Sequence, residues 1–245
     1  WIPARGILVL SEDVAAAQAS VHPRRPQRLV YPGASLERFE AARQESPAAA
    51  RTALGLRAEG PLIGIVGRLQ RWKGMHVAIA AMPAVRAKVP QAQLVIVGGR
   101  HEPEPRYEDE LRALVRQLSL ESAVTFAGFQ SDVPRWMQAM DVVVHASDHE
   151  PFGIVVVEAM ALGKAVVAGS AGGPAEIITP GIDGLLSPFG DAGALAERIS
   201  RFLEDPAFAA RAGAAARRRS ADFSAERYAH GVTDAVISLA LADAG

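Results

Sequence analysis

The chain has 245 residues, of which 49% are hydrophobic, and its formal net charge is −1. This length fits one large domain or two small ones, and the near-neutral charge gives no reason to expect nucleic acid or an acidic membrane surface as a partner. The absence of cysteine excludes disulfides and thiolate metal sites, and no apolar run reaches the roughly 18 residues that suggest a membrane span.

Apolar runs of strand length alternate with helical patterns along most of the chain. The runs that favour strands are residues 5–10, 28–31, 62–66, 93–98, 123–128, 141–146, 164–169 and 183–187. Segments with a 3.6-residue periodicity, such as 74–88 and 107–119, lie between them. This alternation predicts βαβ units and a parallel sheet, and right-handed crossovers place helices on both of its faces. The predicted fold class is therefore α/β.

The two ends of the chain differ from this pattern. Residues 1–31 hold two strand-like runs around a helix-like stretch, and the following YPGASLERF, with Pro32 and Gly33, indicates a linker. A polar, alanine-rich segment at 41–60 leads into the main sheet. After residue 190 nearly all of the chain favours helix, in the segments 191–204, 206–219 and 224–242.

Two cations follow the strand expected at 62–66. In an open parallel sheet, ligands bind beyond the carboxyl ends of the strands, and the loop GRLQRWKG places Arg68 and Lys73 there. Arginine offers a planar fork to two oxygens and lysine a mobile point charge, so together they suit a diphosphate. The alternative is that both are solvated cations on a loop.

The loop SDHEPFG follows the strand expected at 141–146. A helix that begins near Pro151 or Phe152 would have unpaired backbone N–H groups in its first turn, and Gly153 would let a ligand approach the backbone closely. These donors and the positive end of the helix dipole form an anion site without a metal. The apolar run IVVV (154–157) is therefore interpreted as the buried start of a helix, although alone it resembles a strand.

Glu150 and Glu158 bracket this helix start. If both were helical they would lie about 12 Å apart along the axis, which is too far to share a proton but suits two parts of one long ligand. One acid could hold a sugar hydroxyl and the other the hydroxyls of a ribose. The alternative is that Glu150 favours the helix N-terminus and Glu158 pairs with a surface arginine.

Several common motifs are missing. The sequence has no phosphate loop of the G-x-x-x-x-G-K-[ST] type and no G-x-G-x-x-G, and in AGSAG Ala168 stands where the hydrolase elbow requires glycine. His145, Asp148, His149 and Glu150 lack the spacing of a metal site. Because Asp-x-Asp is also absent, we expect no metal and no cofactor, and a diphosphate site that relies on Arg, Lys and backbone donors.

Five segments occur in an order that carries a family resemblance: VGRLQRWKG, VIVGG, TFAGFQSD, HASDHEPFGIVVVEAMALGKAVVAGSAGGPAEII and DGLLSPFGD. Together they resemble the C-terminal, donor-binding domain of the retaining glycosyltransferases of family four, over roughly residues 28–242. The resemblance implies a Rossmann-like sheet, one half of an enzyme with two such domains. It also implies transfer of a sugar from a nucleoside-diphosphate sugar to an acceptor, with retention of the anomeric configuration.

The resemblance assigns roles to residues of this sequence. Arg68, Lys73 and Glu150 would be catalytic, the two cations holding the diphosphate and Glu150 binding hydroxyls of the transferred sugar. Backbone N–H groups at residues 152–155 would contact sugar and phosphates, and Glu158 would bind the ribose. Gly98, Gly99, Arg100 and Gln130 would surround the nucleobase. In full, the donor-binding set is Gly67, Gly98, Gly99, Arg100, Gln130, Phe152, Gly153, Ile154, Val155 and Glu158.

The resemblance also divides the chain. Residues 1–31 would be the residual end of an N-terminal acceptor domain, 32–60 an interdomain linker and lead-in, 61–222 the donor-binding domain, and 223–245 a helix crossing back to the N-terminal domain. The glycine-rich loop and histidine usual in that N-terminal domain are not visible. We therefore expect the isolated chain to bind a nucleoside diphosphate without transferring sugar, the acceptor (glycan, lipid or small molecule) being bound by the missing domain.

Two other functions and several identities stay open. The second candidate function is that of a sugar-nucleotide epimerase, which uses the same scaffold. The third is that of a non-catalytic nucleotide-sugar-binding module. The sequence does not identify the nucleobase of the UDP-, GDP- or ADP-sugar, or the sugar itself. The expected location is cytoplasmic, with peripheral attachment at the inner face of the membrane left open.

Overall fold

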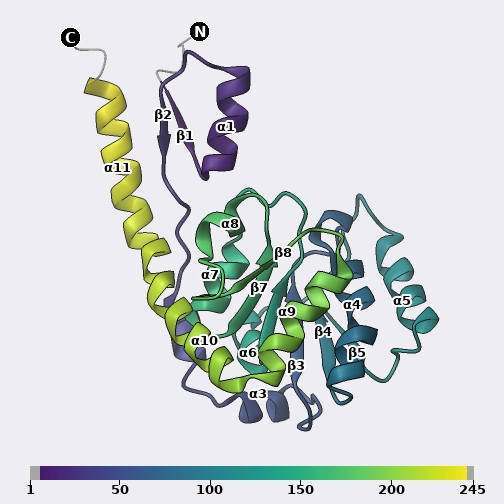
Figure 1. The fold of residues 1–245 in the computed structure, drawn as a ribbon. Helices are drawn as coiled ribbons and strands as arrows, with labels where there is room; N and C mark the ends of the chain where they lie inside the picture. Colours follow the sequence, from purple (N-terminus) through teal and green to yellow (C-terminus); the bar gives the residue numbers. More distant parts are fainter. Residues whose placement is uncertain (1–5, 242–245) are drawn as a thin grey trace.

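The computed structural model describes residues 6–241, and its centre is a six-stranded parallel sheet (Figure 1). The strand order is β5-β4-β3-β6-β7-β8, and every pairing is parallel. The strands are β3 (Leu62–Val66), β4 (Gln93–Val97), β5 (Val124–Gly128), β6 (Val142–His145), β7 (Ala165–Gly169) and β8 (Leu185–Ser187). The predicted α/β class is confirmed, and each of these strands lies within two residues of its expected bounds.

Both faces of the sheet are apolar and buried. Successive residues of one strand enter opposite cores: Val142 and Val144 belong to one buried cluster and Val143 to the other. A strand covered on both sides needs apolar residues throughout, because neither face meets water. This is why the central strands read as unbroken runs of valine, isoleucine and leucine.

Helices cover the two faces as two layers (Figure 1). One layer holds α4 (Met75–Lys88), α5 (Tyr107–Gln117) and α9 (Ala192–Glu204). The other holds α2 (Glu37–Ala42), α3 (Pro47–Ala53), α6 (Val133–Ala139), α7 (Ile154–Ala161) and α8 (Gly173–Ile177). The helix α10 (Pro206–Ser220) contributes to both cores, with Phe208 and Ala212 in one and Ala216 in the other.

A switch in strand order lies between β3 and β6. The chain builds outward from β3 to β4 and β5 on one side, and from β6 to β7 and β8 on the other. At such a point the loops that follow the two neighbouring strands separate to opposite faces and leave a crevice at the carboxyl edge. The topology therefore places the loops after residues 66 and 145 at one ligand-binding crevice.

A small βαβ unit stands apart from the main sheet, beside the far half of α11 (Ala225–Leu241) (Figure 1). It consists of β1 (Ile7–Val9), α1 (Glu12–Val21) and β2 (Gln27–Leu29), with the two strands parallel. The guanidinium of Arg28 donates two hydrogen bonds, of 3.0 and 3.1 Å, to Oγ of Ser238 in α11. The first and last segments of the described chain therefore pack against each other.

Two contacts tie this unit to the main domain. The Glu176 carboxylate accepts hydrogen bonds from the backbone N–H groups of Glu12 (2.9 Å) and Asp13 (3.1 Å), which begin α1. Tyr31, just after β2, packs with its ring centroid 6.0 Å from that of Phe152 and 5.7 Å from that of Phe223. The small unit therefore contacts the segment that leads into α7.

Some predicted bounds were wrong at the ends. The strand expected at 28–31 is Gln27–Leu29, and α2 begins inside the segment that was interpreted as a linker. The helices α3 and α6 and the short α8 were not predicted. Some of the expected segments extend beyond the described residues. These are residue 5 of the first expected strand, residue 242 of the last expected helix, and the outer ends of the segments 1–31 and 223–245. Within residues 6–241, no helix is long and apolar enough to span a membrane.

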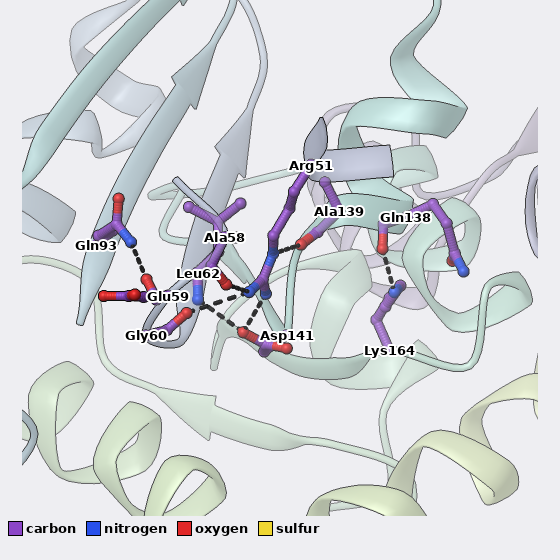
Figure 2. A network of polar contacts seen from close by, with 10 residues as sticks. All are labelled: Arg51, Ala58, Glu59, Gly60, Leu62, Gln93, Gln138, Ala139, Asp141 and Lys164. Carbon is purple, nitrogen blue, oxygen red and sulfur yellow. Dashed lines mark hydrogen bonds and ion pairs between the residues drawn. The ribbon is translucent and has the colours of Figure 1, made fainter. Parts of the chain in front are cut away.

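A buried arginine joins the amino ends of β3 and β6 (Figure 2). The Arg51 guanidinium donates to the carbonyls of Ala139 (2.8 Å) and Gly60 (3.1 Å) and to Asp141 Oδ2 (2.5 Å). The same carboxylate oxygen accepts from the backbone N–H of Leu62 (2.7 Å). Because Asp141 precedes β6 and Leu62 begins β3, this network fixes the two strands beside each other.

We expect Arg51→Met to lower the free energy of unfolding by about 2–4 kcal/mol, because two carbonyls lose their donor and Asp141 loses its counter-ion. The matched control is Arg217→Met, which removes an exposed arginine from α10 and should cost less than about 0.5 kcal/mol. Urea unfolding of the three proteins measures both values. Equal, small changes for the two variants would show that the network contributes nothing to stability.

Candidate functional site

The loops after β3 and β6 meet at the switch in strand order. Lys73 ends a short 3-10 turn (Arg71–Lys73), and its Nζ donates to Oε2 of Glu150. The two side chains are only 17% and 14% exposed. The structure therefore brings together two of the three residues expected to be catalytic, as a partly buried ion pair in the predicted crevice.

A close backbone approach holds these loops together. The N–H of Asp148 donates to the carbonyl of Trp72 at 2.8 Å. At Gly74 φ is 73°, and a Cβ there would lie 1.9 Å from the carbonyl oxygen of Ala146. Glycine is therefore required at Gly74 both by the left-handed backbone and by the contact.

The helix α7 begins at Ile154, two to three residues later than predicted. The carbonyl of Glu150 accepts from the N–H of Gly173 at 2.9 Å, which holds the preceding residues in a bridge instead of a helical turn. The chain turns into the helix at Gly153, where φ is 105°. The interpretation of residues 154–157 as helix is confirmed, with Val156 and Val157 fully buried.

Backbone donors at the start of α7 have no hydrogen-bond partner in the described structure. In the described structure, the backbone N–H groups of residues 152–155 make no hydrogen bond, whereas those of Val156 and Val157 bond to the Gly153 carbonyl. Phe152 itself is buried, and Ile154 and Val155 are half-buried. Four adjacent donors at the positive end of a helix can together hold an anion.

Glu150 is held as a carboxylate. Its burial raises the pKa, but hydrogen bonds and charge from His145 and Lys73 outweigh this and lower the pKa of Glu150 to about 2. His145 Nε2 lies 3.1 Å from Oε2 of Glu150. The acid can therefore only accept hydrogen bonds near neutral pH, as expected for a group that binds hydroxyls.

Glu158 lies in a different environment on the same helix. Burial raises its pKa to about 7, which the charge of Arg38 lowers only in part. It lines a hollow of about 490 Å³ together with Ser35, Arg38, Ile154 and Val155. The two acids therefore differ widely in pKa, and Glu158 faces a space that a ligand group could fill.

The remaining predicted residues gather at the ends of β3, β4 and β5. Gly67 donates to the Val97 carbonyl at 2.9 Å, Gly98 donates to the Gly128 carbonyl at 2.9 Å, and the Gly99 carbonyl accepts from Leu69 at 3.0 Å. A Cβ at Gly98 would lie 1.8 Å from the backbone oxygen of Gly67, so the strand ends can meet only because residue 98 has no side chain. Arg68 is exposed on the loop that follows.

Two predicted side chains are engaged elsewhere. The Arg100 guanidinium pairs with Glu108 at 2.7 Å and Asp109 at 3.1 Å in α5, so its side chain turns toward that helix. The Gln130 amide donates to the Ala127 carbonyl at 2.7 Å within its own turn. The structure therefore places mainly the backbone of Arg100 and Gln130, and not their side chains, near the crevice.

The sequence analysis missed two features of the site, the contact that His145 makes with Glu150 and the exposed ring of Phe129. His145 was considered only as a metal ligand, but it contacts Glu150; within residues 6–241 no group of three potential metal-ligating side chains occurs. Phe129 is 82% exposed beside Gly99. Two features of the sequence could have indicated these residues: a histidine at the end of a buried strand, and an aromatic residue in the polar turn GFQSD.

The family of the chain follows from comparison with known proteins. Residues 48–219 match the family described as glycosyl transferases group 1. This match covers more than half of the chain and includes both loops of the crevice. The chain therefore belongs to this family, and the resemblance to glycosyltransferases is confirmed.

Individual relatives agree with this assignment. The D-inositol 3-phosphate glycosyltransferase of Mycobacterium ulcerans is 34% identical over 236 residues, which cover 95% of this chain and 49% of that protein. The crystal structure of Anabaena HepE in complex with UDP and glucose has a TM-score of 0.86 at 31% identity and covers 96% of this chain and 64% of that one. The structure of sucrose-phosphate synthase from Thermosynechococcus elongatus has a TM-score of 0.86 at 34% identity, and the match covers 98% of this chain and 60% of that one. The chain spans about half the length of the curated relative that it matches.

The pKa of Glu158 predicts a pH dependence of stability. The pKa is about 7 in the folded chain against an ordinary 4.5, so the fold favours the protonated acid. Its stabilising contribution is complete below about pH 4.5 and is lost as the pH rises through about 7. Over this range, wild type should lose on the order of 2 kcal/mol of unfolding free energy relative to Glu158→Gln. Urea unfolding at several pH values measures the difference, and parallel profiles would contradict the prediction.

Proposed function

We propose that this chain is the donor-binding half of a glycosyltransferase that transfers a sugar from a nucleoside-diphosphate sugar with retention of configuration. The observation that carries the proposal is the partly buried pair of Lys73 and Glu150 beside four open backbone donors at the start of α7. A cation and helix N–H groups suit a diphosphate, and a carboxylate suits sugar hydroxyls. Retention is supported by the motif resemblance to family four.

The diphosphate would lie between Lys73 and the first turn of α7. On binding, Lys73 turns from Glu150 to the phosphate oxygens, and the exposed Arg68 adds a second cation. As the sugar leaves, negative charge grows on the diphosphate, and donors already in place stabilise it without reorganisation. With this set of donors, we expect binding without a divalent cation, so that a chelator leaves the affinity unchanged.

The two acids would hold opposite ends of the donor. Glu150, ionised and fixed by two donors, accepts hydrogen bonds from hydroxyls of the transferred sugar. Glu158 lies further along α7, in the hollow that also holds Arg38, and binds the ribose. The nucleobase would lie at the ends of β3, β4 and β5, near Gly98 and Gly99. HepE, which is similar over most of this chain, has also been crystallised in complex with UDP-glucose.

We propose that a further domain, packed on the βαβ unit and α11, binds the acceptor. Apolar side chains on these elements are exposed: Leu8 (40%), Leu29 (39%), Val236 (52%) and Ile237 (51%). The isolated chain should then bind donor but not transfer sugar.

Calorimetry of the isolated chain with UDP, GDP and ADP tests the proposal. We expect one of the three to bind with a Kd below about 1 mM, since a diphosphate can meet Lys73, Arg68 and the α7 donors at once. The same experiment identifies the nucleobase. No binding by any of the three at millimolar concentration would contradict the donor site.

We expect Lys73→Met to weaken binding of the nucleoside diphosphate about 10- to 100-fold, because one charge-assisted hydrogen bond is lost, and to leave binding of the parent nucleoside unchanged. The matched control is Arg71→Met in the same turn, since Arg71 pairs with Glu110 and lies over the ring of Tyr107. Titration with diphosphate and nucleoside measures both effects. Equal losses for the two ligands would exclude a phosphate contact for Lys73.

A further inference from the structure

A buried histidine lies behind the sugar-binding acid. His145 ends β6 and is 4% exposed; its Nε2 lies 3.1 Å from Oε2 of Glu150 and 3.2 Å from Oγ of Ser147. An ionised carboxylate only accepts hydrogen bonds. The nitrogen that faces Glu150 must therefore carry a hydrogen, as it does both in the neutral Nε2–H imidazole and in the imidazolium.

The other ring nitrogen faces a small cavity. Nδ1 of His145 and Oγ of Ser187 are both buried, and neither has a hydrogen-bond partner among the described residues. Both residues line a cavity of about 10 Å³, whose other walls include Val77 and Phe189. This volume is close to that of a single water molecule. When the imidazole is neutral, a water there would donate to Nδ1 and accept from the Ser187 hydroxyl, which favours the Nε2–H tautomer over the Nδ1–H tautomer.

Lys73 makes this histidine important. In the ligand-free chain Glu150 has two donors, Lys73 and His145. Under the proposed function, Lys73 turns to the diphosphate when the donor binds. A carboxylate that is only 14% exposed then depends on its remaining donor for orientation, and that donor is His145.

We propose that His145 is a positioning residue: in the Nε2–H form, supported by Ser187 through the small cavity, it keeps Glu150 aimed at the sugar hydroxyls while Lys73 binds the diphosphate. This inference rests on the proposed function. It assigns the three residues Ser187, His145 and Glu150 to recognition of the sugar, separately from recognition of the nucleotide.

The first test is the tautomer of His145 in the wild-type chain, read from ¹⁵N chemical shifts in a long-range ¹H–¹⁵N NMR spectrum. We expect hydrogen on Nε2 and a shifted Nδ1 resonance in Ser187→Ala. The matched control is Ser200→Ala, which removes another buried hydroxyl without a partner among the described residues, on α9, and should leave the His145 signals unchanged. Hydrogen on Nδ1 with none on Nε2, or equal signals in both variants, would overturn the inference.

The second test separates sugar from nucleotide by calorimetry. The ligands are UDP-glucose, GDP-mannose and ADP-glucose, each against its parent diphosphate. For the pair that binds, His145→Leu should weaken the nucleotide sugar about tenfold and leave the diphosphate unchanged, because the donor to Glu150 is lost. His145→Gln, whose amide nitrogen reaches about as far as Nε2, should restore most of the affinity.

The outcomes distinguish this inference from the proposed function. If wild type binds the nucleotide sugar and His145→Leu weakens it no more than the diphosphate, His145 has no part in sugar recognition and only this inference falls. Equal weakening of nucleotide-sugar binding by His145→Leu and His145→Gln would likewise contradict only this inference. If wild type binds none of the six ligands at millimolar concentration, the proposed function falls as well. The tautomer is measured on wild type, so it tests the geometry even where a variant does not fold.

Discussion

The pairing of β3 with β6 is the constraint on which the rest of the structure depends. The two strands lie side by side where the strand order reverses, so the loops that leave their carboxyl ends open a crevice between them. Arg51 and Asp141 fix the same strands at their amino ends. The network at one edge of the sheet thus holds together the two strands whose following loops carry Lys73 and Glu150 at the other edge.

Close contacts at the carboxyl edge turn this topology into a site. The loop after β3 meets the loop after β6 without a side chain between them at Gly74, and the chain turns at Gly153 into α7, whose first backbone donors have no hydrogen-bond partner in the described structure. A cation and an acid that would be separated in solution are held in contact with little exposure. A ligand that supplies phosphate to Lys73 and hydroxyls to Glu150 replaces both partners at once, so neither charge is left unpaired.

The sequence predicted most of the main sheet, because strands buried on both faces must be apolar throughout and are recognisable without any knowledge of their neighbours. It also predicted that residues 154–157 are helical, from the breakers before them and the helical pattern after them. The start of α7 was misplaced because the bond that delays it, from Gly173 to Glu150, joins residues far apart in the chain. The short helix α2 was missed because it begins within a segment with linker residues.

The site was predictable in its residue types but not in its contacts. The strand pattern placed Lys73 and Glu150 on loops at the carboxyl ends of strands, yet their ion pair depends on strand order and side-chain direction, which the sequence pattern does not report. The pKa of Glu158 depends on burial by residues from other elements, and the turn of Arg100 toward α5 depends on Glu108. His145 was considered only as a metal ligand, because the sequence does not show that its imidazole contacts Glu150.

A crystal structure of the chain with the nucleotide sugar that binds it tests the central claim most directly. We expect the diphosphate within hydrogen-bond distance of Lys73 Nζ and of backbone N–H groups at the start of α7, with Glu150 accepting from the sugar hydroxyls and still bonded to His145. A diphosphate bound elsewhere on the sheet, or a Lys73–Glu150 pair that persists beside the bound donor, would contradict it.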